Sequence, residues 1–250
     1  MKKLTCIVGI DSREKINSGQ IVKAIILNGL GFMSRSLYLF LQFFEDKAIE
    51  HLLGEGIKAE ELNDDKLGRT MDKMYRAGLS KIFLIIALDA IKKYQITTKY
   101  SHLDSTSLHL HGEYKTNTTK KEREIIKENP INIIQGYSRD HRPDLKQCVM
   151  DLIVSSDGDV PLFFRAGDGN ESDKAVFGKI LLEFKNQINF ESIMVCDSAL
   201  YSQNNLKLIE NLNWISRVPF SLKLAKTLVQ SITSSQLEKR VKYLRHSDCL

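Results

Sequence analysis

The stretch SHLDSTSLHL, residues 101–110, alternates polar and apolar positions. Alternation with a period of two predicts a β-strand that turns one face to the core and the other to water. Asp104 stands inside this stretch, although strands are depleted in aspartate and a buried charge is costly unless it is paired or bound to a metal. Asp104 is therefore either a metal ligand or a water-facing residue of an edge strand.

Strands and helices alternate after this stretch. Two apolar runs, 147–155 and 160–165, flank Ser156-Asp157-Gly158-Asp159, and Asp-Gly between apolar runs is a strong hairpin signal. The elements expected next are a helix capped by Ser172, a strand at 192–196, a helix near 202–211 and a strand around 214–218. This order predicts an α/β core with a mixed sheet over residues 100–220.

The region before the sheet, residues 1–99, is predicted to be a helical amino-terminal domain. Apolar side chains recur there every three or four residues, and Asn17 or Ser18, Ser36, Asp64 and Ser80 stand where helices are expected to begin. Short helices joined by glycine turns suit a DNA-binding helix-turn-helix module and a plain helical bundle equally well. The apolar run at 4–10 is expected to be a short strand or a ragged start.

The composition excludes several classes of protein. The 36 basic and 31 acidic residues leave a net charge of +5, which permits a polyanionic partner without requiring one. No stretch reaches the roughly 18 apolar residues of a membrane span. The four cysteines lack the spacing of a zinc site, and three of them lie in apolar runs that predict burial. We therefore expect a soluble, cytoplasmic chain with reduced cysteines.

A second strand carboxylate is Asp197, which directly follows the apolar run 193–196. An aspartate in this position often caps the next helix, and the carboxyl ends of strands are also where open sheets bind ligands. Asp151, inside the run 149–154, is a further strand carboxylate. A metal site that joins Asp104 to His109 and His111 would require a bulge, because five residues separate Asp104 from His109 and place it on the other face.

A basic segment lies between the first strand and the hairpin, at residues 136–146. Arg139, His141, Arg142 and Lys146 are candidate phosphate contacts. A solvated loop with internal ion pairs explains the same composition. The lysine-rich segment 115–129 is expected to be a loop or a small solvated helix, and the acidic turn at 167–173 is expected to be a polar turn with a helix cap.

Taken in order, four stretches resemble bacterial insertion-sequence transposases of the DDE class, in the group that carries a β-strand insertion after the second aspartate. The stretches are 102–114, 136–144, 161–173 and 195–199. Each is weak alone, and the ordered set is fairly specific. The resemblance covers roughly residues 100–220, and the preceding helical region is similar to the amino-terminal domain of one subfamily.

This resemblance implies an RNase H-like sheet with two catalytic, metal-binding aspartates. The first lies on the first strand and matches Asp104, and the second ends the fourth strand and matches Asp197. The implied chemistry is cleavage and strand transfer of double-stranded DNA, both transposon ends and target, with Mg²⁺ or Mn²⁺ as the cofactor. A homodimer is a candidate assembly.

The third catalytic residue of the family is a glutamate on a later helix, and this sequence stops at residue 250. We therefore expect a truncated copy that is inactive as a fragment, with residues 221–250 forming the start of the insertion or a divergent tail. Two rival interpretations are a DNA-binding protein without catalysis and an α/β protein whose carboxylates are structural.

Overall fold

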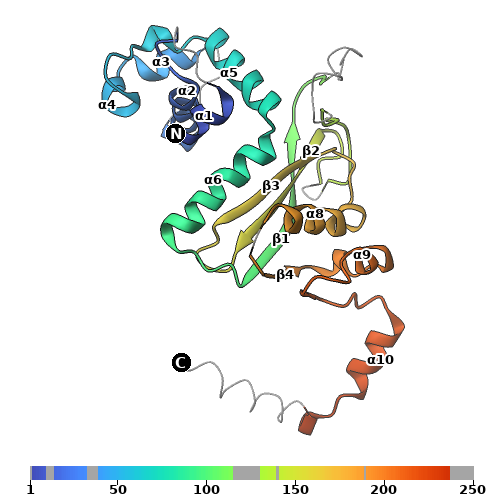
Figure 1. Ribbon diagram of the computed structural model, residues 1–250. Helices are drawn as coiled ribbons and strands as arrows, with labels where there is room; N and C mark the ends of the chain where they lie inside the picture. The colour runs from blue at the N-terminus through green and yellow to red at the C-terminus, as the bar shows by residue number, and fades with distance from the viewer. Residues whose placement is uncertain are drawn as a thin grey trace. The chain divides into compact units, whose positions relative to one another are not determined.

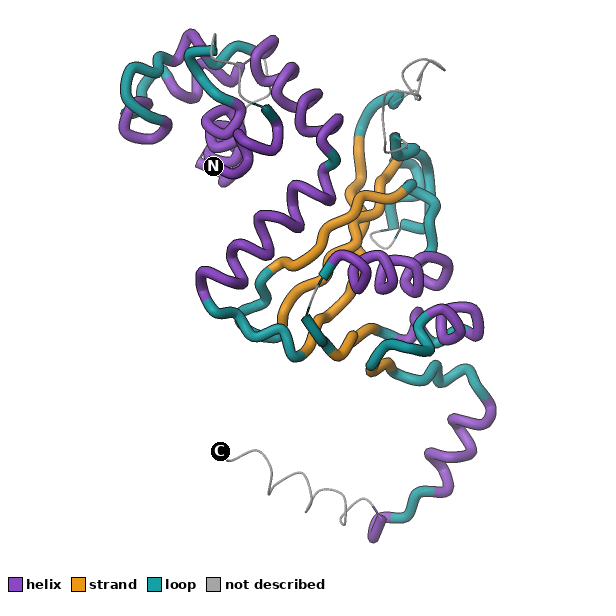
Figure 2. The backbone as a smooth tube through the Cα atoms, in the orientation of Figure 1, coloured by secondary structure: helices purple, strands orange, loops and turns teal. Residues whose placement is uncertain are grey.

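The computed structural model describes residues 2–9, 14–32, 39–114, 130–138, 141–188 and 190–236. The chain forms two compact units. The first contains Met1–Thr97 and Thr106–Asn170, and the second contains Thr98–Ser105 and Glu171–Leu250. Figures 1 and 2 trace the elements along the chain.

The first unit begins with helices. In chain order these are α1 (Lys2–Val8), α2 (Ser18–Leu27), the π-helical turn η1 (Asn28–Phe32), α3 (Phe40–Phe44), α4 (Ile49–Leu53), the 3₁₀ turn η3 (Ala59–Glu61), α5 (Asp64–Ala77) and α6 (Leu79–Tyr94). Their core includes Ile21, Phe40, Phe44 and Leu67. Every described element before residue 95 is helical. The helical amino-terminal domain at residues 1–99 and its DNA-binding role stay predictions.

Two helix starts show how local chemistry sets these elements. Asn17 caps α2, and its side chain accepts from the backbone N–H of Gln20, whose own side chain accepts from the Asn17 N–H. This reciprocal capping box satisfies two backbone donors that the helix leaves free. Helix α6, the last helix before the sheet, has Gly78 as its N-cap residue. The expected N-cap at Ser80 is therefore wrong, because the helix begins two positions earlier.

The expected strand at 4–10 is wrong, because α1 is a helix there. A short apolar run does not distinguish a strand from a buried helix turn. Leu4 is buried, and the hydroxyl of Thr5 contacts the Asn17 side chain at 3.0 Å and accepts from the Gly19 N–H at 3.2 Å. Contacts with the start of α2 therefore accompany the helical form of this run.

The first unit also contains the hairpin of β2 (Lys146–Ser155) and β3 (Pro161–Gly167), which pair antiparallel as predicted. Gly158 and Asp159 adopt positive φ angles of 70° and 51° in the turn. Helix α6 packs on β3, with the rings of Phe83 and Phe164 5.7 Å apart.

The second unit is built on parallel strands. Strand β1 (Tyr100–Leu110) begins in it, and β4 (Ile193–Cys196) pairs parallel with both β1 and β5 (Trp214–Ser216). The helical elements are α8 (Asp173–Gln187), η4 (Ser198–Leu200), α9 (Gln203–Leu208) and α10 (Lys223–Ser231). Helices α8 and α9 lie side by side (Figure 1).

The five strands form one mixed sheet in the order β3-β2-β1-β4-β5. The predicted α/β class with a mixed sheet is thus confirmed. Helix α10 was not predicted, and it buries none of its side chains against the described residues. The lysine-rich segment 115–129 and the tail from residue 237 lie outside the described residues. Within the described ranges, no helix combines the length and apolar character that crossing a membrane requires.

Candidate functional site

Asp104 and Asp197 occupy matching positions at one end of two paired strands. The register aligns Ser101 with Met194 and Leu103 with Cys196, and the two aspartates are the next residue on each chain. Residues aligned on neighbouring strands share a face, and such strands lie about 4.8 Å apart. Continued by one residue, this register makes the two aspartates neighbours at the ends of adjacent strands, and both are exposed.

Each carboxylate is oriented by one backbone N–H. Asp104 accepts from the N–H of Ser105 at 2.8 Å, and Asp197 accepts from the N–H of Ala199 at 2.8 Å, which caps the short turn η4. The expected capping role of Asp197 is therefore real and coexists with its place in the pair. In the part of the chain that the structure describes, no hydrogen bond reaches the other oxygen of either carboxylate, so both remain available to a ligand.

The pKa of the Cys196 thiol is raised in part by both carboxylates. Burial raises its pKa most, and the negative charges of Asp197 and Asp104 raise it further, to about 12. Cys148 is buried as expected, whereas Cys6 is exposed, so the expected burial is wrong for that cysteine.

Within the described ranges, no third ligand joins the pair. Among the described residues, no three His, Cys, Asp or Glu side chains are grouped so that they could hold a metal ion. The combined site of Asp104, His109 and His111 is therefore not formed. His109 instead lies 3.0 Å from the hydroxyl of Ser138, which ties the basic segment to β1.

The basic segment is held by internal contacts. Arg142 forms a two-point ion pair with Asp144, at 2.9 and 2.7 Å, and its N–H donates to Ser138. This hydrogen-bonded arginine lowers the pKa of Asp144 to about 2. The alternative of a loop with internal ion pairs is thus correct for Arg142.

The other three predicted phosphate contacts differ in their surroundings. His141 is exposed and adopts a positive φ of 56°, and the ammonium of Lys146 donates to the backbone oxygen of Glu113 at 2.9 Å. Arg139 lies outside the described residues. A DNA-binding role for these residues stays a prediction.

Two glycines of the quoted stretches, Gly136 and Gly169, have a structural role. A Cβ on Gly169 would lie 2.1 Å from the backbone oxygen of Gln147, and a Cβ on Gly136 would lie 1.9 Å from the backbone oxygen of Gly169. The buried amide of Gln147 donates to Gly169 at 2.7 Å, and Asp168 accepts two hydrogen bonds from Asn132. The acidic turn at 167–173 thus fastens the segment after Pro130 to the hairpin.

Asp151, the remaining strand carboxylate, is fully buried and structural. Its Oδ2 accepts from the guanidinium of Arg165 at 2.7 Å, across the β2–β3 ladder where the two residues are in register. A buried carboxylate is tolerated when a cation pairs with it.

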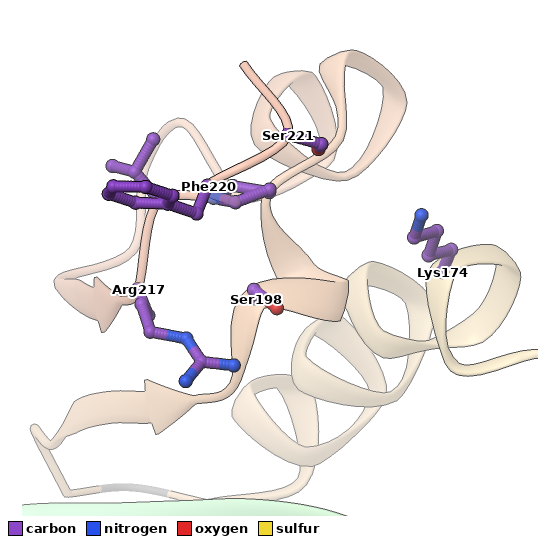
Figure 3. A pocket seen from close by; sticks show the side chains of 7 residues that line it. Lys174, Ser198, Arg217, Phe220 and Ser221 are labelled. Atoms are coloured by element: carbon purple, nitrogen blue, oxygen red, sulfur yellow. The ribbon is translucent and has the colours of Figure 1, made fainter. Parts of the chain in front are cut away.

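A pocket of about 590 Å³ lies in the second unit, and Ser198, the residue after Asp197, is part of its wall. We call it the cationic pocket; it is lined by Lys174, Ser198, Arg217, Val218, Pro219, Phe220 and Ser221 (Figure 3). Sequence reasoning missed these residues, because Lys174 and Arg217 are far apart in the chain and neither stands in a basic cluster.

Known proteins resemble this chain only in part. A family model described as a domain of unknown function (DUF4277) matches residues 2–102, which is less than half of the chain. No curated protein matches.

Solved structures of transposase complexes resemble the chain. They include the Mos1 transposase paired-end complex with left transposon end (12% identity, TM-score 0.31, 83% of this chain and 59% of that one) and the piggyBac transposase synaptic complex with hairpin DNA (10%, 0.45, 93% and 50%). The chain thus spans between half and three fifths of these two. At such identities and TM-scores, the similarities do not identify a family for the chain.

Proposed function

We propose that this chain is part of a DNA transposase of the DDE class, with Asp104 and Asp197 as two of the metal-binding carboxylates of an RNase H-like core. The observation that carries the proposal is the alignment of these two exposed aspartates on β1 and directly after β4. The resemblance of the four sequence stretches implies catalytic aspartates at these two positions, one on the first strand and one at the end of the fourth.

The carboxylate pair fits a hard divalent cation. Mg²⁺ prefers carboxylate oxygens, keeps several waters and is commonly held by one or two carboxylates. Backbone N–H groups fix the orientation of both carboxylates and leave one oxygen of each available. When bound there, Mg²⁺ or Mn²⁺ would supply charge stabilisation for displacement at a phosphodiester.

Two adjacent carboxylates without a cation also repel each other and any phosphate. A structural role for the pair explains neither their exposure nor their alignment, because a capping role requires only Asp197. The pair is therefore better explained as a binding site than as a support for the fold.

The partner proposed for this chemistry is double-stranded DNA. The net charge of +5 and the basic segment 136–146 favour a polyanion, and neutralised phosphates make affinity fall with added salt. The transposon ends, the target DNA and a homodimeric assembly belong to the same proposal.

The test measures Mn²⁺ binding from the electron paramagnetic resonance signal of the free ion. The wild-type chain is compared with Asp104→Asn and Asp197→Asn, and with Asp72→Asn as a control, since Asp72 is an exposed aspartate of α5. We expect each site variant to weaken binding by at least about tenfold, a loss that even indirect changes around metal sites cause, and the control to match the wild type. Equal Mn²⁺ affinity in all four proteins would refute the proposal.

Duplex binding is measured in parallel by fluorescence anisotropy at several salt concentrations. If the site variants lose Mn²⁺ and keep DNA, the metal site and the DNA-binding surface are separate. A wild-type chain that binds duplex DNA with salt dependence but does not bind Mn²⁺ is instead the DNA-binding protein without catalysis.

A further inference from the structure

We propose that the cationic pocket binds one phosphate of a DNA strand and that the unpaired base beside this phosphate stacks on Phe220. This inference rests on the proposed function, because it adds a strand-binding site next to Asp197. The first argument is the composition of the lining: two cations, two hydroxyl groups and one aromatic ring surround about 590 Å³.

The lining residues come from three elements of the second unit. Lys174 lies in the first turn of α8, Ser198 begins η4, and Arg217 and Phe220 follow β5. Figure 3 shows Lys174 and Arg217 on opposite sides of Ser198. Charges on two sides of a space suit an anion with several oxygens better than a carbonyl or an apolar group.

A buried asparagine fixes two of these elements relative to each other. The amide of Asn205 donates to the backbone oxygen of Lys174 at 3.1 Å and lies 3.5 Å from that of Ala199. A Cβ on Gly178 would lie 2.8 Å from the Asn205 amide oxygen, so α8 packs closely on this side chain. The start of α8 and the turn η4 are therefore held together at the pocket.

The third element is tied to the carboxylate pair itself. The hydroxyl of Ser216 donates to the backbone oxygen of Asp197 at 2.7 Å, and Arg217 is the next residue. The pocket and the carboxylates thus belong to one connected arrangement of strand ends, and a strand held in the pocket would lie beside Asp197.

The two cations of the pocket are available, unlike Arg142. Neither Lys174 nor Arg217 forms an ion pair with another described residue, and Lys174 is exposed. Arginine presents a planar set of donors that matches phosphate oxygens, and lysine adds a flexible point charge. Two unpaired cations near two carboxylates also offset the repulsion that a phosphodiester would meet there.

The aromatic ring favours a nucleotide over free phosphate. Phe220 is 60% exposed although it lines the pocket, and an exposed ring is a stacking surface for an unpaired base. A pocket of this volume is in the range of small-molecule and cofactor sites. Bases inside a duplex are already stacked on each other, so the occupant we propose is a single-stranded stretch of DNA.

The test uses the full chain with a fluorescent single-stranded oligonucleotide in the presence of EDTA, so that the carboxylate metal site does not contribute. Variants are Lys174→Gln with Arg217→Gln, singly and together, and Phe220→Leu. Matched controls are Lys179→Gln on the same helix, Arg76→Gln on α5 and Tyr94→Leu, because Lys179, Arg76 and Tyr94 are exposed outside the pocket. Thermal unfolding of each variant shows that it is folded.

We expect the double charge variant to bind at least tenfold more weakly and to show a smaller salt slope, by about 0.7 for each phosphate that the variant no longer neutralises. Phe220→Leu should weaken binding severalfold without changing the salt slope. Folded variants that bind as tightly as their controls would overturn the inference. Inorganic phosphate competing as well as the unlabelled oligonucleotide would overturn the stacking component.

The two proposals fail separately. Mn²⁺ binding should be unchanged in the pocket variants, because none of them alters Asp104 or Asp197. If the pocket variants lose oligonucleotide binding and the wild-type chain does not bind Mn²⁺, the proposed function is refuted and the strand-binding pocket stands. Normal Mn²⁺ binding with unaffected oligonucleotide binding would refute only the pocket.

Discussion

Arg142 holds the carboxylate of Asp144 at two points, with Nε 2.9 Å from Oδ1 and Nη2 2.7 Å from Oδ2. One of the cations that the sequence offers for phosphate contacts, Arg142, is therefore already paired. A phosphate that approaches Arg142 must compete with Asp144, and both side chains are exposed enough for this competition to occur.

The first prediction follows from this competition. Asp144→Asn should strengthen binding of duplex DNA by about three- to tenfold at low salt, because it frees Arg142 and removes a charge that repels phosphate. Fluorescence anisotropy measures the change. Asp159→Asn removes the same charge from the hairpin turn, and an equal gain there would mean that only net charge matters.

The same pair gives a pH prediction. The pKa of Asp144 is lowered to about 2 by its hydrogen-bonded arginine, so the ion pair should persist at any pH well above 2. Its contribution to stability is fully present above the unfolded pKa of about 3.9 and is lost as the pH falls towards 2. A carboxyl ¹³C titration should show a midpoint near 2, rising towards 3.9 in Arg142→Gln. An unshifted wild-type midpoint would contradict the ion pair.

The close approach of Gly169 to the backbone oxygen of Gln147 predicts that a side chain at position 169 strongly destabilises the fold. Gly169→Ala places a methyl group 2.1 Å from the Gln147 oxygen, where backbone must move, so we expect destabilisation of more than about 3 kcal/mol, above the usual cost of overpacking. Urea unfolding followed by circular dichroism measures it. Gly68→Ala in α5 meets no atom within 4 Å and should instead stabilise by about 0.5–1 kcal/mol. An unchanged free energy of unfolding in Gly169→Ala would show that the backbone at Gln147 moves aside at little cost.

The buried pair on the hairpin predicts strong non-additivity. Arg165→Met removes the cation that contacts the buried Asp151 carboxylate at 2.7 Å, so it should cost about 3–5 kcal/mol. The double variant Asp151→Leu with Arg165→Met removes both charges and should be more stable than Arg165→Met alone. A double variant whose loss equals the sum of the two single losses would argue against coupling.

The raised pKa and the burial of Cys196 predict that its thiol, next to Asp197, reacts slowly with alkylating reagents. With a pKa of about 12, only on the order of 10⁻⁴ of this thiol is ionised at pH 8, and it is also buried. Iodoacetamide should therefore modify the exposed Cys6 long before Cys196, as peptide mass spectrometry can show. Removing both negative charges with Asp104→Asn and Asp197→Asn should speed the reaction of Cys196 only slightly, because burial is the largest cause of the shift. Rapid labelling in the wild type would mean that the strand ends are open.

Much of the fold followed from local chemistry. The capping position of Asn17, the Asp157-Gly158 turn and the alternation around Asp104 each specify one element, and the structure contains all three. The strand predicted at 4–10 was wrong because the conformation of this run depends on contacts with Asn17 and Gly19, which lie outside the run itself.

Only part of the candidate site could be predicted from the sequence, again because tertiary contacts are not visible in a short stretch. Asp104 and Asp197 stand out because carboxylates are unusual in and beside apolar strands. Lys174 and Arg217 do not stand out, since single surface cations are common and only the tertiary fold brings them together. The partner of Arg142 was two residues away in the sequence, yet composition alone did not decide between an ion pair and a phosphate contact.

The parallel pairing of β1 with β4 has a consequence for synthesis of the chain. Leu103 and Cys196, which the ladder aligns, are 93 residues apart (196 − 103), and joining such distant segments is slow because loop closure precedes any gain from the pairing. At about 5–20 residues per second, a ribosome makes the second strand roughly 5–20 seconds after the first. During that interval Asp104 has no neighbour on β4, so a nascent chain cannot yet hold a cation between the two aspartates. The carboxylate pair therefore assembles only after the residues that separate β1 from β4 have been synthesised.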